Sequence, residues 1–395
     1  MLPPFLTRRR MLGTAGIVTA SLPGSAAAID LKDFGGKEGQ DIGPALERAV
    51  ESGGGAPITI GPGEYWLGKP FVYRNRDKFL TSSRGPGIVL VGSGSQRTII
   101  QCVAQGPAAI EVAQERPYRF TTGGRFEGFS LRGNPKALAQ DGLRLSGAWN
   151  YTIADVDIVG FTGHGLSIPW REDLRWALND VEIVAGSKVA HRRNKDGFTD
   201  DTGLTGAMRI FGPGIPAGAT ISRLVDGQTL EMSASATQTG TYTLEFVGNV
   251  DAFQSIVELN GCRFLGNDGW GLWGGAGIGA AVSWIQTEAA QNRTGGVFCG
   301  GNAWSLRGGS INTSEGVGLL VDRVPGGGGP LMLNVERIEF DSNTGGHVWL
   351  KQMSGASFQR CRFISHYSAS TGKHRPEIGL IIGNTPVNGL AACRT

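Results

Sequence analysis

"IADVDIVGF", residues 153–161, places apolar residues at alternate positions and ends in a glycine turn. Alternation with a period of two is typical of a β-strand that buries one face. Related segments recur at intervals of about 20–25 residues where no insertion intervenes, a length typical of solenoid repeats. They share an apolar–variable–apolar centre and are FEGFSLRGN (126–134), IADVDIVGF, LNDVEIVAG (178–186), LNGCRFLGN (259–267), VERIEFDSN (335–343) and FQRCRFISH (358–366).

Most of these segments are followed by a glycine turn and a second short strand, as in "GHGLSIP", "GWGLWGG" and "GVGLLVD". Short strands joined by Gly and Asn turns, without helices between them, predict an all-β, right-handed parallel β-helix. Each coil of such a solenoid buries its inward residues only by stacking on its neighbours. The alignment places Cys262 and Cys361 inward, which predicts buried free thiols. Asn267, Asn292 and Asn343 share a turn position, where Asn tolerates a left-handed backbone.

An N-terminal segment adds independent support for this architecture. Residues 33–67, "DFGGKEGQDIGPALERAVESGGGAPITIGPGEYWL", predict a short amphipathic helix over Asp41–Glu51, then a strand and a Pro-Gly turn. The segment resembles the start of the pectate-lyase-like superfamily, and the resemblance implies that the helix caps the open end of a β-helix. This superfamily holds lyases, hydrolases, epimerases and phage tailspikes, so the resemblance leaves the activity open.

The first 28 residues predict a targeting segment. Three arginines (8–10) precede an apolar run, 11–22, and small residues suited to cleavage follow. The run is too short to span a bilayer, and the arginine pair resembles a twin-arginine export signal. We therefore expect a mature β-helix domain over 29–395, located in the periplasm or secreted, with no membrane anchor after cleavage. The alternative is a basic tail before a buried helix.

Charge and motif content narrow the function classes. Removing the signal leaves 37 − 3 = 34 basic and 34 acidic residues, so no overall attraction to nucleic acid is expected. The sequence contains no phosphate-binding glycine loop, no dinucleotide fingerprint and no H-E-x-x-H or G-x-S-x-G motif. Its five cysteines show no metal-binding spacing. No cofactor is therefore evidently required.

Residues 187–248 interrupt the repeat. They are rich in Thr, Gly and Ala and contain alternating strands around a "PGIPAG" turn. This composition predicts a small antiparallel β insertion projecting from one coil. Such an insertion either walls a binding groove or is a passive decoration, and the sequence leaves both open.

His164 has two interpretations. "GFTGHGLSI" (160–168) resembles the histidine segment of polygalacturonases, which cleave pectin. The same G-x-G-L pattern recurs with Trp270 and Val317 in the middle position, as expected for a variable site of the repeat. The N-T-D, D-D and R-I-K segments that accompany the histidine in polygalacturonases are missing at comparable positions. Histidine alone does not supply the acid and base of glycoside hydrolysis.

The variable outward positions of the repeat carry the other catalytic candidates. Asp155, Asp157, Asp180 and Glu182 are expected on two adjacent coils about 5 Å apart, with Arg263 one coil further on. Crowded carboxylates raise the pKa of one member, as glycoside hydrolysis requires. Alternatively they bind Ca²⁺, which would neutralise a uronate while an arginine assists elimination. The third interpretation is a ladder of solvated charges.

Aromatic and basic side chains near this cluster predict sugar contact. Flat indole faces stack on sugar rings, and arginines bind polar groups. The substrate-binding candidates are Trp170, Arg171, Arg175, Trp176, Trp270 and Trp273.

Together these features predict an exported enzyme that cleaves an extracellular or cell-envelope polysaccharide by elimination or hydrolysis. The alternative is a non-catalytic polysaccharide-binding protein of tailspike type, and a homotrimer is one assembly left open. If the acidic cluster is catalytic, replacing Asp157 or Glu182 by its amide should reduce activity by about 10²- to 10⁴-fold and leave the fold intact.

Overall fold

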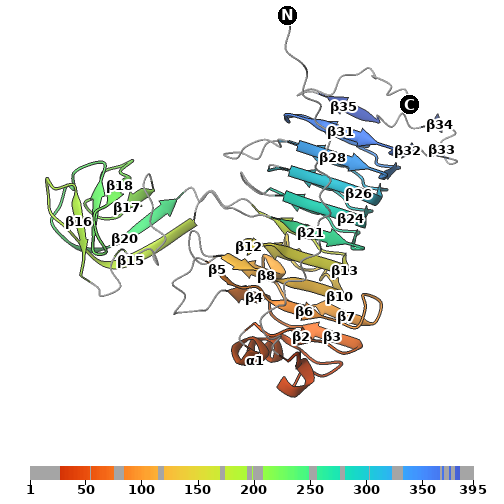
Figure 1. The fold of residues 1–395 in the computed structure, drawn as a ribbon, viewed down its shortest axis with the longest axis horizontal. Helices are drawn as coiled ribbons and strands as arrows, with labels where there is room; N and C mark the ends of the chain where they lie inside the picture. The colour runs from red at the N-terminus through yellow and green to blue at the C-terminus, as the bar shows by residue number, and fades with distance from the viewer. Residues whose placement is uncertain are drawn as a thin grey trace, which may run out of the picture.

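The computed structural model describes residues 27–53, 55–74, 84–113, 120–169, 174–193, 198, 208–248, 256–275, 281–301, 303–322, 332–364, 367–368, 373–374 and 379–382. Most of residues 1–28, the predicted export signal, lies outside these ranges. The described part is a right-handed parallel β-helix with a separate β-rich unit projecting from its side (Figure 1). This confirms the predicted fold class.

The largest sheet, sheet A, runs the length of the solenoid, and all its strand pairs are parallel. Its strands are β1 (Ile29–Asp30), β2 (Ile58–Thr59), β3 (Gly63–Leu67), β6 (Val89–Val91), β7 (Thr98–Cys102), β10 (Arg125–Arg132), β13 (Tyr151–Val159), β21 (Val257–Asn260), β22 (Arg263–Leu265), β24 (Ala281–Ala290), β26 (Ala303–Asn312), β28 (Met332–Glu336), β29 (Glu339–Asp341), β31 (Ala356–Gln359) and β32 (Arg362–Ile364).

A second parallel sheet, sheet B, lies on another side of the coils. Its strands are β4 (Phe71–Arg74), β8 (Ala108–Ala113), β11 (Asp141–Leu145), β14 (Leu166–Ile168), β23 (Trp270–Gly274), β25 (Gly295–Cys299), β27 (Val317–Val321), β30 (Val348–Leu350) and β35 (Leu380–Ile382). Smaller sheets are formed by β5 (Arg84–Pro86), β9 (Phe120–Thr122) and β12 (Ala148–Trp149), and by β33 (Tyr367–Ser368) with β34 (Lys373–His374). In the described ranges no helix has the length and apolar character needed to cross a membrane.

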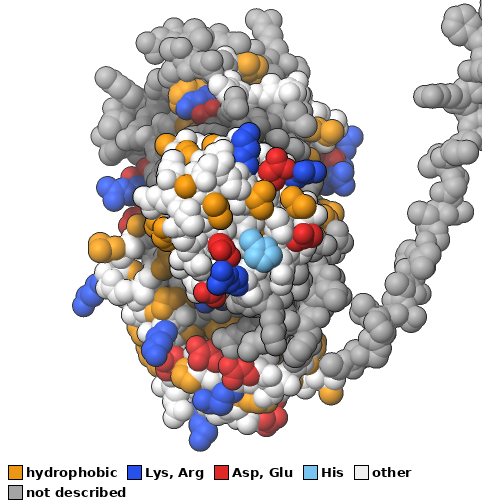
Figure 2. All heavy atoms as spheres, turned by 90° about the vertical axis from the view of Figure 1, so that its left-hand side faces the viewer, with side chains coloured by type: hydrophobic (Ala, Val, Ile, Leu, Met, Phe, Trp, Pro, Cys, Tyr) orange, Lys and Arg blue, Asp and Glu red, His pale blue; other side chains and the backbone are white. Residues whose placement is uncertain are grey.

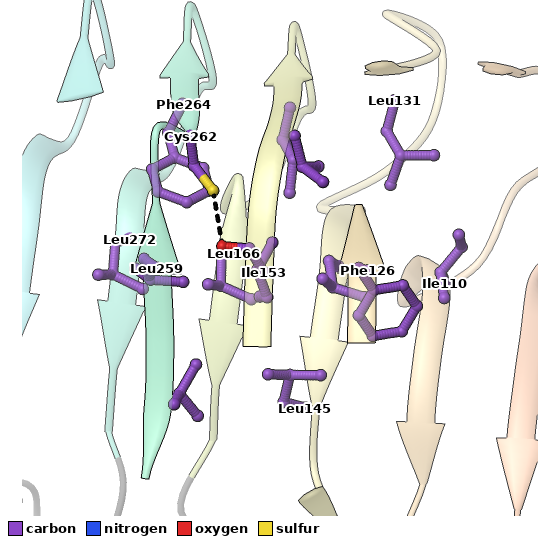
Figure 3. Close-up of a cluster of buried hydrophobic side chains, with 14 of the residues drawn as sticks. Ile110, Phe126, Leu131, Leu145, Ile153, Leu166, Leu259, Cys262, Phe264 and Leu272 are labelled. Carbon is purple, nitrogen blue, oxygen red and sulfur yellow. Dashed lines mark hydrogen bonds between the residues drawn. The ribbon is translucent and has the colours of Figure 1, made fainter. Parts of the chain in front are cut away.

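The core consists of columns of apolar side chains that stack from coil to coil. On sheet A, Phe126, Ile153, Leu259 and Trp284 occupy one register position and are fully buried. On sheet B, the residues at one register position are Ile110, Leu143, Leu166, Leu272, Val297 and Leu319. Each side chain therefore packs on the same position of its neighbouring coils, as the repeat predicts. Figure 3 shows members of both columns facing each other across the interior.

The predicted inward position of Cys262 is confirmed. Its thiol donates to the carbonyl oxygen of Ile153 at 3.2 Å (Figure 3), and burial raises the thiol pKa to about 12. Cys361 is a free thiol as well, but it is only partly buried because it lies near the C-terminal end of the stack. Cys262 therefore behaves as a packing residue in an unreactive protonated form, and Cys361 packs against the edge of the core.

The shared turn position of the three asparagines has a different cause from the one predicted. Asn267, Asn292 and Asn343 are fully buried, and the left-handed φ angles fall on the preceding residues, such as Gly266, Gln291 and Ser342, not on the asparagines. The asparagines form an internal ladder. The Nδ2 of Asn267 donates to the Oδ1 of Asn292 at 2.9 Å, and the Nδ2 of Asn292 donates to the carbonyl of Phe264 at 3.0 Å. The ladder satisfies backbone groups where the chain turns inside the solenoid.

The recurrent G-x-G-L pattern follows from this ladder. The second glycine of each copy faces the interior beside an asparagine of the next coil. A Cβ at Gly165 would lie 2.9 Å from the Nδ2 of Asn267, and a Cβ at Gly271 would lie 2.6 Å from the Nδ2 of Asn292. Any larger residue at the second glycine would displace the asparagine amide, so the G-x-G-L pattern is explained by packing. The variable residue between the glycines is free to differ.

The N-terminal end of the solenoid is closed by helix α1 (Gly43–Gly53), preceded by the short 3₁₀ helix η1 (Leu31–Phe34). α1 starts two residues later than predicted, after Asp41, whose Oδ1 accepts from the Gly43 N–H at 2.9 Å. Ala45, Leu46 and Ala49 are buried against the first coils. Figure 1 shows α1 across the end of the stack, which confirms the predicted cap.

The projecting unit is a small antiparallel barrel, here called the barrel (residues 174–248). Its strands, in spatial order, are β17 (Arg209–Phe211), β20 (Gly240–Gly248), β15 (Leu174–Ile183), β16 (Val189–Arg192), β19 (Thr229–Met232) and β18 (Ile221–Leu224). A bridge between Arg209 and Thr220 joins the two outermost strands, with the Ile210 N–H donating to the Ala219 carbonyl at 2.8 Å. The sheet is therefore closed, which removes exposed strand edges.

The barrel begins earlier than the predicted start at residue 187. β15 contains residues 178–183 of the segment "LNDVEIVAG" (178–186), which the repeat pattern assigned to a solenoid coil, and that assignment was wrong. β15 pairs antiparallel with β16 and β20, and the coil after β13 is formed by β21 and β22. Alternation alone fits a strand of a barrel as well as a strand of a solenoid, since both have one buried face.

The barrel has its own core, made by residues such as Val181, Ile183, Leu230, Leu244 and Phe246, which is separate from the core of the solenoid. In Figure 1 it extends away from the side of the stack. Figure 2 looks onto the side from which it projects, and there basic and acidic side chains are interspersed with apolar ones. Among the side chains coloured in this view, no patch of a single sign covers the face.

Candidate functional site

The structure confirms most of the predicted outward column on sheet A but separates the four carboxylates. The column is formed by Ser130, Asp157, Arg263, Glu288, Ser310, Glu339 and Arg362 in consecutive strands. Asp180 and Glu182 lie in β15 of the barrel, so they are not beside Asp155 and Asp157. Glu182 pairs instead with Arg193 at 2.9 Å, which lowers the pKa of this carboxyl. The predicted four-acid groove is therefore not formed.

Asp155 and Asp157, on β13, hold a turn between β6 and β7, two coils earlier in the stack. Asp155 accepts from the Ser95 hydroxyl at 2.8 Å and from the Ser95 N–H at 3.1 Å, and its own backbone is left-handed at a strand corner. Asp157 is only 3% exposed and accepts from the Gln96 side chain at 2.9 Å. These contacts secure the Ser95–Gln96 turn over sheet A, which leaves Asp157 little surface for a ligand.

Arg263 completes this arrangement. Its Nε donates to the Oδ1 of Asp157 at 2.8 Å, and its Nη2 also contacts the same carboxylate. The pair raises the pKa of the Arg263 guanidinium. Within the described residues, no group of three or more His, Cys, Asp or Glu side chains could hold a metal ion. The cluster that the Ca²⁺ alternative needed is thus dispersed, and the geometry at Asp157 and Arg263 is that of a structural ion pair.

The predicted sugar-binding residues divide into three groups. Trp170 and Arg171 lie outside the described residues. Arg175 and Trp176 belong to β15, in the part of that strand whose side chains are not described. Trp273 lies on the outer face of sheet B between His164, 5.5 Å away and parallel within 8°, and Phe298, 6.0 Å away and within 18°.

This stacking corrects the expected mode of contact. Both faces of the Trp273 indole are covered, so only its edge is open to a ligand. Trp270 is 8% exposed and packs against Phe298 with a centroid distance of 5.7 Å. Neither indole therefore offers a free face on which a sugar ring could stack.

Around His164 the outer face of sheet B carries a polar network, here called the sheet B cluster (Glu111, Asp141, Arg144, His164 and Ser167). Register places Glu111, Arg144 and Ser167 on adjacent strands β8, β11 and β14. The Arg144 guanidinium lies between two acids, with Nε 3.9 Å from the Oε1 of Glu111 and Nη1 3.8 Å from the Oδ2 of Asp141. Both acids are below 9% exposed, whereas Arg144 keeps 27% of its side chain exposed.

Serine hydroxyl groups hold the carboxylates of Asp141 and Glu111 in place. The Ser167 hydroxyl donates to the Oδ2 of Asp141 at 2.6 Å, and the Ser146 hydroxyl donates to the Oε1 of Glu111 at 2.9 Å. The other oxygen of Asp141 accepts from the backbone N–H of His164 at 2.8 Å. Each carboxylate oxygen has two lone pairs, so Asp141 keeps acceptor capacity. The buried Nε of Arg144 has no hydrogen-bond partner among the described residues.

His164 is held in one orientation. Its Nδ1 accepts from the backbone N–H of Trp270 at 2.9 Å, and its ring stacks on Trp273. An Nδ1 that accepts a hydrogen bond carries no proton, so the neutral ring carries its proton on Nε2. Burial lowers the pKa of His164. The charge of Arg144 lowers this pKa further, whereas the charge of Asp141 raises it. The lowered pKa keeps the ring neutral near pH 7.

The sequence pointed to His164, Trp270 and Trp273 in this cluster but missed Glu111, Asp141 and Arg144. The available signal was the position of these residues between inward apolar residues of the second strand in each coil, as in "DGLRL" (141–145). The outward positions predicted as candidates all belong to the first strand of each coil. The outward positions of the second strand place Glu111, Arg144 and Ser167 in one column.

Comparison with known proteins gives fold-level likeness only. No family model matches the chain. No curated protein matches it either. Among solved structures, the A-module of the Azotobacter vinelandii mannuronan C-5 epimerase AlgE4 shares 13% identity at a TM-score of 0.46, over 90% of this chain and 87% of that one. The AlgE6 A-module of the same organism shares 14% identity at 0.42, over 90% and 85%.

A third similar structure is the Dettilon tailspike protein, with 9% identity, a TM-score of 0.40, and coverage of 90% of this chain and 59% of that one. Identities and TM-scores this low do not carry activity from one protein to another, because the parallel β-helix hosts many functions. The sheet B cluster is therefore the basis for assigning a function.

Proposed function

We propose that this chain is an exported polysaccharide-active protein that engages its glycan on the outer face of sheet B, at the sheet B cluster. The observation that carries the proposal is the arrangement of Arg144 and His164, two partly exposed donors, above the carboxylates of Asp141 and Glu111. Donors and acceptors fixed on rigid strands suit the dense hydroxyl pattern of a sugar, since a preorganised site loses little conformational entropy on binding.

As an enzyme, the protein would cleave an extracellular or cell-envelope polysaccharide by hydrolysis or elimination. Asp141 and Glu111 are the candidates for proton transfer, because they are the carboxyl groups of the sheet B cluster and flank a cation. His164 is not the base in this arrangement. The lone pair of Nδ1 is engaged by the Trp270 N–H, and Nε2 carries the proton. Its role is to donate a hydrogen bond to the glycan.

The second candidate function is polysaccharide binding without cleavage, as in a tailspike-like surface protein. One observation favours it: Asp141 and Glu111 are nearly buried and already accept hydrogen bonds from serine hydroxyls. Carboxylates in such positions act readily as structural anchors. A ligand then meets mainly Arg144, His164 and the edge of Trp273.

The test is incubation of the mature protein with a panel of plant and bacterial polysaccharides. New reducing ends without ultraviolet absorbance indicate hydrolysis, and reducing ends with the absorbance of an unsaturated uronate indicate elimination. Binding in affinity electrophoresis without either product supports the second candidate. If no member of a broad neutral and acidic panel is bound or cleaved, the proposed function is wrong.

A further inference from the structure

We propose that residues 383–395, which lie outside the described ranges, fold back over the last coil and close that end of the solenoid, as α1 closes the other end. The surface that they cover is the exposed end of the apolar core at β31, β32 and β35, opposite α1 in Figure 1. This contact is independent of the glycan and of the sheet B cluster.

Two inward columns of the core end in exposed side chains. On sheet A, Phe363 of β32 occupies the register position of Phe340, which is fully buried, yet Phe363 is 40% exposed. On sheet B, Ile382 of β35 occupies the register position of Leu350, which is 5% exposed, yet Ile382 is 69% exposed. Both residues belong to the last described strand of their column, so no further described coil packs on them.

The strands of this coil also have open edges. Within the described ranges, β31 and β32 pair only with β28 and β29, and β35 pairs only with β30. Phe358, Cys361 and Leu380 of the same coil are only partly buried against the core. An open strand edge beside exposed apolar side chains promotes aggregation, and a solenoid needs a terminal cap to stay soluble. This end of the stack therefore needs a covering segment.

The opposite end of the solenoid shows how little such a cap requires. There the terminal strands are β3 and β4, and their inward residues Leu67 and Phe71 are buried. They share one core cluster with Ala45, Leu46 and Ala49 of α1. One short helix with a narrow apolar face thus helps to bury residues that the first coil would otherwise expose.

Residues 383–395 start at the end that has to be covered. They follow β35 directly, so the first of them is bonded to the exposed Ile382. These 13 residues span at most about 43 Å when extended and about 20 Å as a helix, whereas two packed sheets lie about 10 Å apart. The segment is therefore long enough to cross from β35 to β32.

The sequence of the segment, GNTPVNGLAACRT, has the pattern of a capping helix. Thr385-Pro386 is a helix-start signal, because Thr caps the first turn and Pro fits the first helical position. Val387, Leu390 and Ala391 then lie on one helical face, with the i, i+3, i+4 spacing. α1 likewise has a proline in its first turn and buries alanines and a leucine at i+3 and i+4 spacing.

The charges at this end favour the segment over a second copy of the chain. Residues 356–364 contain two exposed arginines, Arg360 and Arg362, and no acid. In a symmetric contact between two copies the same patch meets itself, so these arginines would approach their counterparts. Residues 383–395 carry one charged side chain, Arg394, at the far end from β35.

The Cys361 thiol reports whether the end of the core is covered. The full mature protein and a variant truncated after Ile382 are treated with a maleimide, and peptide mass spectrometry separates the label on Cys361 from that on Cys393. We expect truncation to raise the labelling rate of Cys361 by at least about tenfold. The buried thiols of Cys102, Cys262 and Cys299 should stay unlabelled in both proteins, which verifies that the solenoid remains folded.

Two neighbouring alanines provide a matched pair of variants in the full chain. Ala391→Asp places a charge on the apolar face and should raise the labelling rate of Cys361 by at least about tenfold, since burying an unpaired charge is costly. Ala392→Asp, the same substitution off that face, should keep the wild-type rate.

Three results would overturn the proposal. In the first, Cys361 of the full protein reacts as fast as in urea. In the second, neither truncation nor Ala391→Asp raises its rate. In the third, a slow rate in the full protein rises on dilution, which would identify a second copy as the cover.

Discussion

Asp157 and Arg263 are 106 residues apart in the chain, yet they form an ion pair on neighbouring strands of sheet A. The chain leaves the solenoid after β14, forms the barrel, and returns at β21 to the adjacent coil. The pair therefore joins the two sides of an insertion. Its Asp157 carboxylate is 3% exposed and also receives the Gln96 amide, so one carboxylate links three coils.

Asp157→Asn should weaken the fold and leave glycan binding unchanged, the reverse of what the sequence predicts for a catalytic acid. Loss of charge-assisted hydrogen bonds to a buried carboxylate should cost about 1–3 kcal/mol of unfolding free energy. Glu339→Gln, on the same column but paired with the exposed Arg362, should cost less than about 1 kcal/mol. Urea denaturation measures both. Wild-type stability of Asp157→Asn, or lost activity in the folded variant, would restore the catalytic interpretation.

Replacing the barrel (residues 174–248) by a short Gly-Ser linker should leave the solenoid folded. The cores of the barrel and the solenoid share no residue, and the barrel closes its own sheet. The solenoid should keep its β-type circular dichroism and a cooperative melt. The barrel expressed alone should also unfold cooperatively. Aggregation of the deletion variant, together with an unfolded isolated barrel, would show that the two parts depend on each other.

The sequence predicted the solenoid, its cap and its outward column on sheet A from the alternation of apolar residues, because that alternation records burial directly. It misassigned β15 since residues 178–183 show the same alternation in the barrel. Which strand lies beside β13 depends on pairing between distant segments. A pattern of period two within one strand does not specify its partner.

The asparagine ladder predicts a coupling between Gly271 and Asn292. Asn292→Ala leaves the Phe264 carbonyl and the Asn267 amide without their buried partner, at a cost of about 1–3 kcal/mol for each group. Gly271→Ala places a methyl 2.6 Å from the Asn292 amide and should also destabilise. In the double variant this clash is absent, so the loss should be smaller than the sum. Urea unfolding of the four proteins gives the coupling energy, and strict additivity would contradict the packing explanation of the G-x-G-L pattern.

The sheet B cluster was only partly predictable. His164 stood out because its motif resembles a known catalytic segment, whereas Arg144 and Glu111 carry no motif. They form a site because register aligns β8, β11 and β14, and the inward residues Ile110, Leu143 and Leu166 stack in that register. The stacking of His164 on Trp273 depends on side-chain rotamers in two adjacent coils. Along the chain, these coils are separated by the barrel. Side-chain rotamers and the pairing of distant strands are set only in the folded protein, so the sequence pattern does not predict them.

His347 should make the fold sensitive to acid. It is 2% exposed, near Phe340 and Phe363, and burial lowers its pKa from the ordinary 6.5, with Asp341 opposing the shift. The unfolded chain then binds a proton more readily than the folded one, so the stability is complete above about pH 6.5 and decreases as the pH falls below it. The slope should approach about 1.4 kcal/mol per pH unit for this residue.

The measurement is the urea midpoint of the wild type, His347→Gln and His191→Gln between pH 7.5 and about pH 5. His347→Gln should flatten the decline in acid, whereas His191→Gln, at an exposed position of the barrel, should follow the wild type. Because burial also lowers the pKa of His164, some decline should persist in His347→Gln. Identical slopes in all three proteins would show that His347 takes up its proton equally in both states.

Two replacements of His164 should separate its structural role from its role in binding. The amide oxygen of Asn can take the place of Nδ1 and accept from the Trp270 N–H, but Asn has no donor at the position of Nε2. Gln reaches the Nε2 position with an amide N–H but leaves the Trp270 N–H without its acceptor. We therefore expect His164→Asn to keep wild-type stability and lose glycan affinity by about tenfold, the value of one hydrogen bond. His164→Gln should lose about 1–3 kcal/mol of unfolding free energy and keep most of the affinity. Urea denaturation and affinity electrophoresis on the same preparations give both quantities. If His164→Asn binds as tightly as the wild type, the Nε2–H does not contact the glycan, and the binding surface has to be sought elsewhere on the solenoid.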